Sequence, residues 1–354
     1  MRRLARPFSL AVLLCVATAG CSSNMAEGTV APSAAAVAPF GTLSSELPVP
    51  PLGPDPCKRF KGQRLYVAVI DGERASKIEV FDAKASGNVS PICTITYTPM
   101  YLLGGLTVDS NGHLWAMTCD HEPGSLLVFP HAQNDGSNPI QDITGSKTEL
   151  SGSCYAQATL AIDSSGNTWA PDNLGSYVIA FANDANGNVS PIASIGLHDH
   201  GQSESISRPQ ALGFDKDGNL HGAENTLPGT IDVFQPPFTD TSKPIAQWTV
   251  PGGLNGYALY LAIDKHDNLY LAGQTNLDIY PGALKSNGVP SVEMSNTPYI
   301  GGLAVDDRGN LYVSAQTNSA SSIDVLGRLP TSYKPVRQIF NNFTGDNYTI
   351  GIGS

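Results

Sequence analysis

Two histidines separated by a single residue offer the clearest metal-binding chemistry in this sequence. His198 and His200 stand in the polar stretch GLHDHGQSESISRP. Carboxylates are available nearby in the repeat described below, at Asp172 and at Glu224. Imidazole nitrogens and carboxylate oxygens are ligands that zinc and other transition metals accept. The candidate metal ligands are therefore His198, His200 and Asp172, and the sequence identifies no fixed third partner for the histidine pair.

A second group of candidates consists of tyrosine and amide side chains at similar places in successive repeats. Aromatic rings stack on flat ligand faces, and amides orient a ligand by hydrogen bonds, as in sites for sugars and other polar molecules. The alternative is that the tyrosines are structural caps bonded to the backbone. The candidate ligand-binding residues are Tyr101, Tyr155, Gln210, Tyr257, Tyr299, Asn173, Asn225, Asn276 and Asn318.

No residue is assigned a catalytic role. The sequence has no HExxH zinc motif, no GxSxG nucleophile elbow and no phosphate-binding GxxxxGK motif. We therefore expect a non-catalytic binding module without a cofactor. The alternative is a metal-assisted hydrolase or lyase with a divalent metal ion as cofactor. Its site would use His121, Asp172, His198, His200 and Glu224.

One twelve-residue phrase occurs five times and predicts the elements that hold these side chains. Alternating apolar residues, a four-residue polar turn and a second alternating run are typical of a β-hairpin. The fourth turn position is Gly in four copies and Asp267 in one, which indicates a left-handed backbone. We expect the leading Asp to accept hydrogen bonds from turn amides rather than to bind calcium. The copies are LTVDSNGHLWAM (106–117), LAIDSSGNTWAP (160–171), LGFDKDGNLHGA (212–223), LAIDKHDNLYLA (261–272) and LAVDDRGNLYVS (303–314).

Two further runs complete each repeat. A third apolar run, such as KIEVF (77–81) or TIDVF (230–234), is followed by a polar turn and a fourth run that opens with proline. Proline has no N–H to donate to a ladder, so it belongs at strand starts or on edge strands. The fourth strand is therefore expected at the outer edge. The prolines are Pro91, Pro139, Pro191, Pro244, Pro290 and Pro335.

Four antiparallel strands repeated at intervals of about 50 residues predict an all-β fold, a β-propeller. Six fourth strands are visible but only five first strands, because the first repeat begins directly at QRLYVAV (63–69). The alternating C-terminal run NYTIGIGS (347–354) has no partner after it. We therefore expect six four-stranded blades, with the C-terminal strand closing the ring in blade one.

The repeat xAxDxxGNLYVA followed by xxIxVF resembles the NHL family of propellers, and the phrase GNVSPI resembles NHL-like exported bacterial proteins. The resemblance spans residues 63–354 and implies the fold. Sugar lactonases on related propellers need a Glu where this chain has YTIGIG. Streptogramin lyases, which have a similar repeat, use a histidine late in the sequence, whereas the last histidine here is His266, in a hairpin turn. Neither activity is therefore implied.

The N-terminus predicts export and a lipid anchor. Arginines precede an apolar run from Leu10 to Ala19, which is too short to span a membrane and is typical of a signal peptide. Ala19 and Gly20 before Cys21 resemble the lipobox of bacterial lipoproteins, in which that cysteine is acylated. We expect a signal peptide over residues 1–20, an Ala/Pro/Ser-rich tether over 21–56 and the propeller over 57–354.

Four cysteines remain in the predicted exported body, and an even number in an exported chain favours disulfides. Cys119 and Cys154 fall in loops on one face of neighbouring blades, so we predict that they pair. Cys57 would then pair with Cys93 on the outer strand of blade one.

The composition limits the partners. A net charge of −11 argues against nucleic acid and against electrostatic binding to anionic lipid. We expect a monomer in the cell envelope, anchored by lipid and facing the periplasm or the exterior. Its partner would be a polar small molecule, a glycan or a protein.

Overall fold

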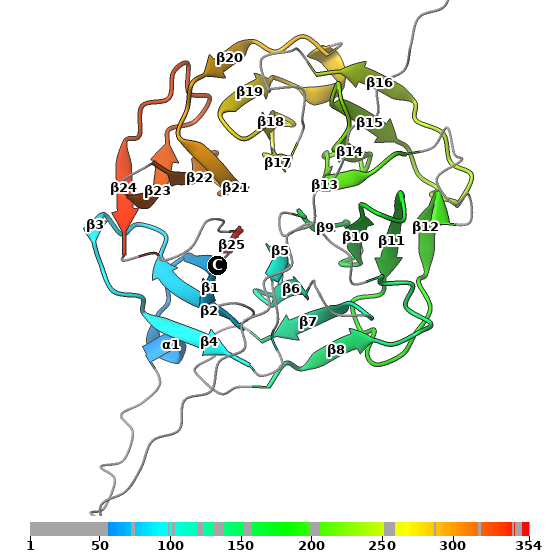
Figure 1. Cartoon of the computed structure of the whole chain (residues 1–354), viewed down its shortest axis with the longest axis horizontal. Helices are drawn as coiled ribbons and strands as arrows, with labels where there is room; N and C mark the ends of the chain where they lie inside the picture. The colour runs from blue at the N-terminus through cyan, green and yellow to red at the C-terminus, as the bar shows by residue number, and fades with distance from the viewer. Residues whose placement is uncertain are drawn as a thin grey trace, which may run out of the picture. The chain divides into compact units, whose positions relative to one another are not determined.

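A computed structural model describes most of the chain from Pro56 to Gly353 and shows a ring of six β-sheets (Figure 1). The described residues are 56–71, 75–97, 100, 103–118, 123–130, 138–151, 158–197, 206–250, 259–286, 288–317, 320–341, 343 and 349–353. No helix within these ranges has the length and apolar character needed to cross a membrane.

Each sheet is one blade, and its strands follow one another outward from the axis. Blade one contains β25 (Ile350–Gly353), β1 (Arg64–Asp71), β2 (Ala75–Asp82) and β4 (Cys93–Thr96). Blade two contains β5 (Leu103–Val108), β6 (Leu114–Thr118), β7 (Ser125–Phe129) and β8 (Gln141–Thr144). Blade three contains β9 (Ala161–Ile162), β10 (Thr168–Asp172), β11 (Tyr177–Phe181) and β12 (Ala193–Ile195).

The other three blades have the same antiparallel order. Blade four contains β13 (Pro209–Phe214), β14 (Leu220–Glu224), β15 (Thr230–Phe234) and β16 (Ala246–Thr249). Blade five contains β17 (Tyr260–Ile263), β18 (Leu269–Ala272), β19 (Asn276–Tyr280) and β20 (Val292–Ser295), with the 3₁₀ turn η3 (Ala283–Ser286). Blade six contains β21 (Tyr299–Val305), β22 (Leu311–Gln316), β23 (Ser321–Leu326), β24 (Arg337–Phe340) and, outermost, β3 (Gly87–Asn88).

The C-terminal strand closes the ring, as the strand count predicts. β25 pairs antiparallel with β1, from Arg64 opposite Gly353 to Val67 opposite Ile350. The two ends of the propeller sequence therefore share one sheet, and the predicted all-β propeller with six blades is confirmed.

The hairpin turns have the predicted backbone. Gly112, Gly166, Gly218 and Gly309 all have φ near +80°, and Asp267 has φ of +63°. In every copy the leading aspartate accepts the backbone N–H groups two and four residues later, as Asp163 does from Ser165 and Asn167. The turn-capping interpretation of these aspartates is therefore confirmed.

The core of the described residues consists of six apolar clusters, one between each pair of neighbouring blades. Phe129, Phe181 and Phe234 end three of the third strands, Phe81 is the last residue but one of a fourth, and each is no more than 1% exposed. Burying one such ring contributes roughly 1.5–3 kcal/mol, so the repeated VF and AF dipeptides stabilise the packing of blade on blade.

The outer edge differs from the prediction in blade six. All six prolines lie two residues before a fourth strand, and five of these strands are outermost in their sheets. In blade six the outermost strand is instead β3, which comes from the connection between β2 and β4 and runs parallel to β24. A connection from the following blade thus covers this edge.

Cys57 and Cys93 form a disulfide, with Cα atoms 5.7 Å apart. This is the pairing that the sequence predicts for these two cysteines, and it ties α1 (Pro56–Arg59) to the outer strand of blade one. The side chain of Arg64 also holds this segment, because its guanidinium donates to the carbonyls of Cys57 and Phe60. The predicted Cys119–Cys154 pair lies outside the described residues.

Candidate functional site

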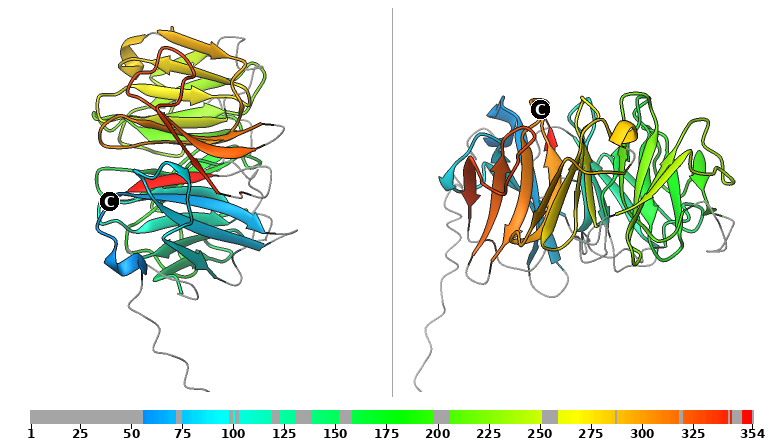
Figure 2. Two further views of the ribbon diagram at one scale, coloured as in Figure 1. Left: turned by 90° about the vertical axis from the view of Figure 1, so that its left-hand side faces the viewer. Right: turned by 90° about the horizontal axis from the view of Figure 1, so that it is seen from above.

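The strand directions define two faces of the ring (Figure 2). We call the face with the connections from second to third strands the loop face. The opposite face, with the Asp-led hairpin turns, is the turn face. First strands start at the loop face, so the residues at their beginnings and those just after the second strands gather there. The predicted ligand-binding residues that the structure describes belong to this loop face.

Three predicted amide side chains form one cluster between blades three and four. Asn173 donates through Nδ2 to the backbone O of Arg208 at 3.0 Å and to Oε1 of Gln210 at 3.1 Å. Nδ2 of Asn225 is 3.4 Å from the same Gln210 oxygen. Asn173 and Gln210 are 3% and 1% exposed. The structure thus brings together Asn173, Gln210 and Asn225, which we call the amide cluster.

One acceptor of the amide cluster is unused. Among the described residues, Oδ1 of Asn173 has no hydrogen-bond partner although it is buried. A buried carbonyl oxygen without a partner is uncommon in folded proteins and needs an explanation, such as a bound ligand or water.

A tyrosine that the sequence analysis did not select lies on the same face. Tyr260, at the start of β17, is 2% exposed, and its hydroxyl has no partner among the described residues. Burial, and then the neighbouring Tyr299, raise the pKa of Tyr260, so its hydroxyl stays protonated. The equivalent residues in three other blades are the small residues Gly105, Ala211 and Gly302. A large tyrosine at this position is the signal by which the sequence could have identified Tyr260 as a candidate.

The other two described candidates are placed at the same face. Tyr299 begins β21 and is half-buried, opposite Gln316 in the sheet. Asn276 begins β19 and is buried, and its Oδ1 accepts the Thr275 hydroxyl at 3.2 Å. They lie in blades six and five, whereas the amide cluster joins blades three and four.

Asp172, a candidate metal ligand, caps the turn between β10 and β11. Its Oδ1 accepts the backbone N–H of Gly175 at 2.7 Å. Its Oδ2 lies 3.1 Å from the Tyr177 hydroxyl and 3.3 Å from the backbone N of Ser151. Burial, and then the Asp172 charge, raise the pKa of Tyr177.

Glu224, the other candidate carboxylate, accepts the backbone N–H of Ser207 and lies beside Asp232. Burial, and then Glu224, raise the pKa of Asp232 to about 8. Asp232 therefore holds a proton at neutral pH, and its Oδ1 accepts from Gln247 at 2.7 Å. The bond from Ser207 to Glu224 joins blade four to the segment that enters it.

Within the described ranges, no three His, Cys, Asp or Glu side chains form a group able to hold a metal ion. The metal site with His198 and His200 stays a prediction. The candidates outside the described residues are Tyr101, Tyr155, Tyr257, Asn318, His121, His198, His200 and Cys21.

Comparison with known proteins shows the fold alone. No family model matches the chain, and no curated protein matches it. A protein of unknown function from Bacteroides caccae has a TM-score of 0.55 at 11% identity, over 82% of this chain and 98% of that one. The WD40 β-propeller domain of Doa1 has a TM-score of 0.48 at 12% identity, over 83% and 98%. A chain of the Mitotic Checkpoint Complex has 0.48 at 13% identity, over 77% and 76%.

Proposed function

We propose that this chain is an exported, lipid-anchored β-propeller of the NHL type that acts as a non-catalytic binding module. It takes a polar small molecule or a glycan on its loop face and works as a monomer in the cell envelope. The NHL-like repeat and the lipobox-like N-terminus support the class and the location. Propellers host many functions, so the ligand is argued from the site itself.

The ligand class is argued from two of the buried polar atoms that have no partner among the described residues, Oδ1 of Asn173 and the hydroxyl of Tyr260. Asn173 directly follows β10 and Tyr260 begins β17, so both residues stand at loop-face ends of strands. A buried polar group without a partner costs about 1–3 kcal/mol, and a ligand that supplies the missing bond recovers this free energy. A carbonyl oxygen needs a donor, and a tyrosine hydroxyl can donate or accept. Hydroxyl groups can act as donor or acceptor and so match both kinds of atom, which favours a sugar or polyol.

The first test is a thermal-shift screen of neutral mono- and oligosaccharides, followed by calorimetry on any that stabilise the protein. Tyr260→Phe should weaken binding about five- to tenfold, which corresponds to the ~1 kcal/mol of one hydrogen bond. It should not lower the melting temperature, because the buried hydroxyl that it removes has no partner among the described residues. Tyr155→Ala, which removes one of the predicted ligand-binding tyrosines, should also weaken binding.

Tyr312→Phe is the matched control. Its hydroxyl bonds to the carbonyl of Ala83 across the interface of blades six and one, so its loss should lower stability and leave the affinity unchanged. An unaltered affinity in Tyr260→Phe would reject this site. A loss of binding in the double variant His198→Ala, His200→Ala would instead favour the metal site.

The anchor is tested separately. Cys21→Ser should move the protein from the membrane fraction to the soluble fraction, because the acylated residue is removed. Stable anchoring needs more than one acyl chain, which lipoprotein modification supplies. Fractionation followed by immunoblotting measures this. Retention of Cys21→Ser in the membrane fraction would show that lipid on this residue is not the anchor.

A further inference from the structure

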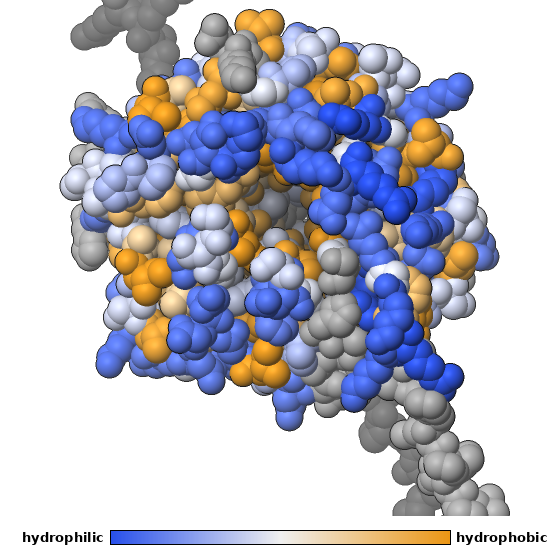
Figure 3. Space-filling model, turned by 180° about the vertical axis from the view of Figure 1, so that it is seen from behind, coloured by the Kyte–Doolittle hydropathy of each residue, from blue (hydrophilic) through white to orange (hydrophobic). Residues whose placement is uncertain are grey.

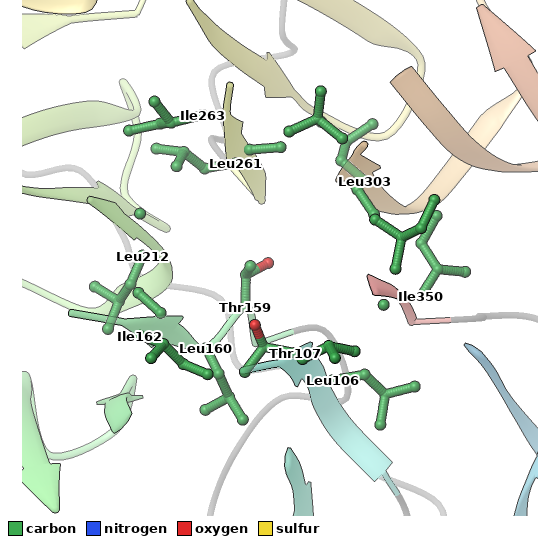
Figure 4. Close-up of a pocket in the computed structure, with 18 of the residues that line it drawn as sticks. Leu106, Thr107, Thr159, Leu160, Ile162, Leu212, Leu261, Ile263, Leu303 and Ile350 are labelled. Atoms are coloured by element: carbon green, nitrogen blue, oxygen red, sulfur yellow. The ribbon is translucent and has the colours of Figure 1, made fainter. Parts of the chain in front are cut away.

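The axial chamber of the propeller offers no charged group to a ligand. It has a volume of about 280 Å³ and is lined by the innermost strands of all six blades, and none of the described residues that line it is charged. Figure 4 shows two of its polar side chains, Thr107 and Thr159, close together on one side. At the centre of the turn face, Figure 3 shows a hollow. A side chain that selects the charge of a ligand must therefore lie outside this chamber.

The amide cluster adjoins the chamber wall on the side of the loop face. Thr159 donates its backbone N–H to the carbonyl of Gln210 at 3.0 Å and accepts the N–H of Leu212 at 3.1 Å. The chain entering the innermost strand of blade three is therefore bonded directly to the innermost strand of blade four. Through its side chain, Gln210 bonds to Asn173 of the amide cluster. Two residues before Gln210, at the loop face, stands the cation Arg208.

Arg208 has a backbone conformation that is uncommon for a residue with a side chain. Its φ is +49°, and that of Ser176, its partner in blade three, is +58°. The N–H of Arg208 donates to Oγ of Ser176 at 3.2 Å. Its carbonyl accepts Nδ2 of Asn173 and the backbone N–H of Asn225, both at 3.0 Å. Hydrogen bonds from two blades thus hold this backbone in place, and residues held at positive φ often lie at ligand clamps.

The guanidinium of Arg208 is available to a ligand. The residue is exposed, and no carboxylate in the described part of the chain forms an ion pair with it. The carboxylate of Glu224 instead accepts the N–H of Ser207, the residue before Arg208. Arginine binds carboxylates through two parallel, charge-assisted hydrogen bonds. An unpaired arginine beside the amide cluster therefore favours a ligand that carries a carboxylate.

Two exposed leucines give the same place an apolar component. Leu174, next to Asn173, and Leu227, two residues after Asn225, are 59% and 62% exposed. They lie at the loop face, in the connections from second to third strands of blades three and four. Ligand sites combine apolar contacts with a few polar groups that set orientation. The C–H groups of a sugar ring can pack on such leucines, which favours a sugar acid over a small inorganic anion.

We propose that the ligand of the loop face is an acidic saccharide, whose carboxylate is bound by Arg208 while its hydroxyl groups bond to Ser176 and the amide cluster. This inference rests on the proposed function and deepens it, because it names the class of sugar that the same site takes. Arg208 is then the residue that distinguishes acidic from neutral sugars.

The probes are two matched pairs, glucuronate with glucose and galacturonate with galactose. Within each pair a carboxylate replaces the hydroxymethyl group of the neutral sugar. Ligand-observed NMR titrations use the full chain carrying Cys21→Ser, which avoids membranes and detergent. In at least one pair the acid should bind at least tenfold more tightly, because it adds charge-assisted hydrogen bonds to Arg208.

The outcomes separate this inference from the proposed function. Equal binding of acid and neutral sugar in both pairs would overturn the acidic class and leave a site for neutral sugars. Acetate that binds as tightly as the sugar acids would reduce the site to one for simple anions and would also overturn the proposal. No binding of any probe would count against the sugar site as a whole.

Arg208→Gln tests the location, because glutamine keeps a polar side chain and removes the charge. It should lower the affinity for the sugar acid at least tenfold, leave that for the neutral sugar unchanged and melt like the parent. The matched control is Arg308→Gln, the same change at an exposed residue of the turn face, which should bind like the parent. Arg208→Lys, which keeps the charge, should retain part of the preference. An undiminished preference for the acid in Arg208→Gln would overturn the proposal.

Discussion

At the scale of single residues, the aspartate that opens each hairpin turn is the main device for local order. Burial alone would raise the pKa of Asp215, but hydrogen bonds from His221 and Asn219 lower it to about 2. The exception at the glycine position also has a local reason. The Asp267 carboxylate accepts the backbone N–H of Lys216 in blade four at 2.8 Å, so a side chain at positive φ joins two blades.

The raised pKa of Asp232 predicts how the free energy of unfolding depends on pH. Its folded-state pKa is about 8, whereas an unfolded aspartate titrates near ~4, so between these values only the native state holds the proton. The stabilisation that this proton gives the folded state is complete below the unfolded pKa and is lost as pH rises through the folded pKa. Over this range the free energy of unfolding falls by up to about 1.4 kcal/mol per pH unit. Asp278, with pKa raised to about 7 by burial and then by Glu293, acts in the same direction.

Asp232→Asn should therefore flatten the pH dependence of unfolding, because an amide has no proton to lose in this range. Urea denaturation between pH 5 and pH 9 would measure it. Asp217→Asn, at an exposed position, should keep the parent slope. A parent protein whose unfolding free energy rises from pH 5 to pH 8 would contradict the raised pKa of Asp232.

At the scale of elements, the connection between third and fourth strands reaches back to the preceding blade. In blade three, Asn188 Oδ1 accepts the backbone N–H of Lys147 at 2.7 Å, and Gly187 donates to the Asp142 carbonyl at 2.8 Å. In blade one, the equivalent segment is β3, and Val89 donates to the carbonyl of Phe340 at 3.0 Å. These connections occupy backbone groups of outer strands that would otherwise be open edges.

Removing one side chain from such a connection should have a modest effect. Asn188→Ala loses the bond to Lys147 and should lower the unfolding free energy by about 0.5–1.5 kcal/mol. Asn88→Ala is the control, since Asn88 is exposed and its segment is held through backbone groups, so its cost should be close to zero. Urea midpoints compare the two. Equal costs would show that the amide bond of Asn188 contributes little.

At the scale of the whole molecule, ring closure makes the C-terminal strand structural. Ile350 is 3% exposed and belongs to the apolar cluster between blades six and one. Removing residues 345–354 leaves blade one without its innermost strand and exposes the edge of β1. We expect an insoluble or strongly destabilised product, judged by solubility and thermal melting. The single variant Ile350→Ala, which keeps the strand, should stay soluble. A truncated protein that melts like the parent would refute this closure.

Most of the fold was predictable from the sequence because its rules are local. Period-two alternation predicts strands, Gly at the fourth turn position predicts positive φ, and a proline before each fourth run predicts its place far from the axis. The unmatched C-terminal run then specifies six blades. The loop-face positions of Asn173, Gln210 and Asn225 follow from the same connectivity, since every second strand ends on one face.

Only the tertiary structure decided which groups from different blades meet. The sequence does not show that Asn173 and Gln210 bond to each other, that burial and Glu224 raise the pKa of Asp232, or that Tyr260 has a buried hydroxyl without a partner among the described residues. The axial chamber has the same origin, because its volume depends on how six innermost strands approach one another. Hydrogen bonding and alternation act within one repeat, whereas the partners and the space at the axis arise only when six repeats close into a ring.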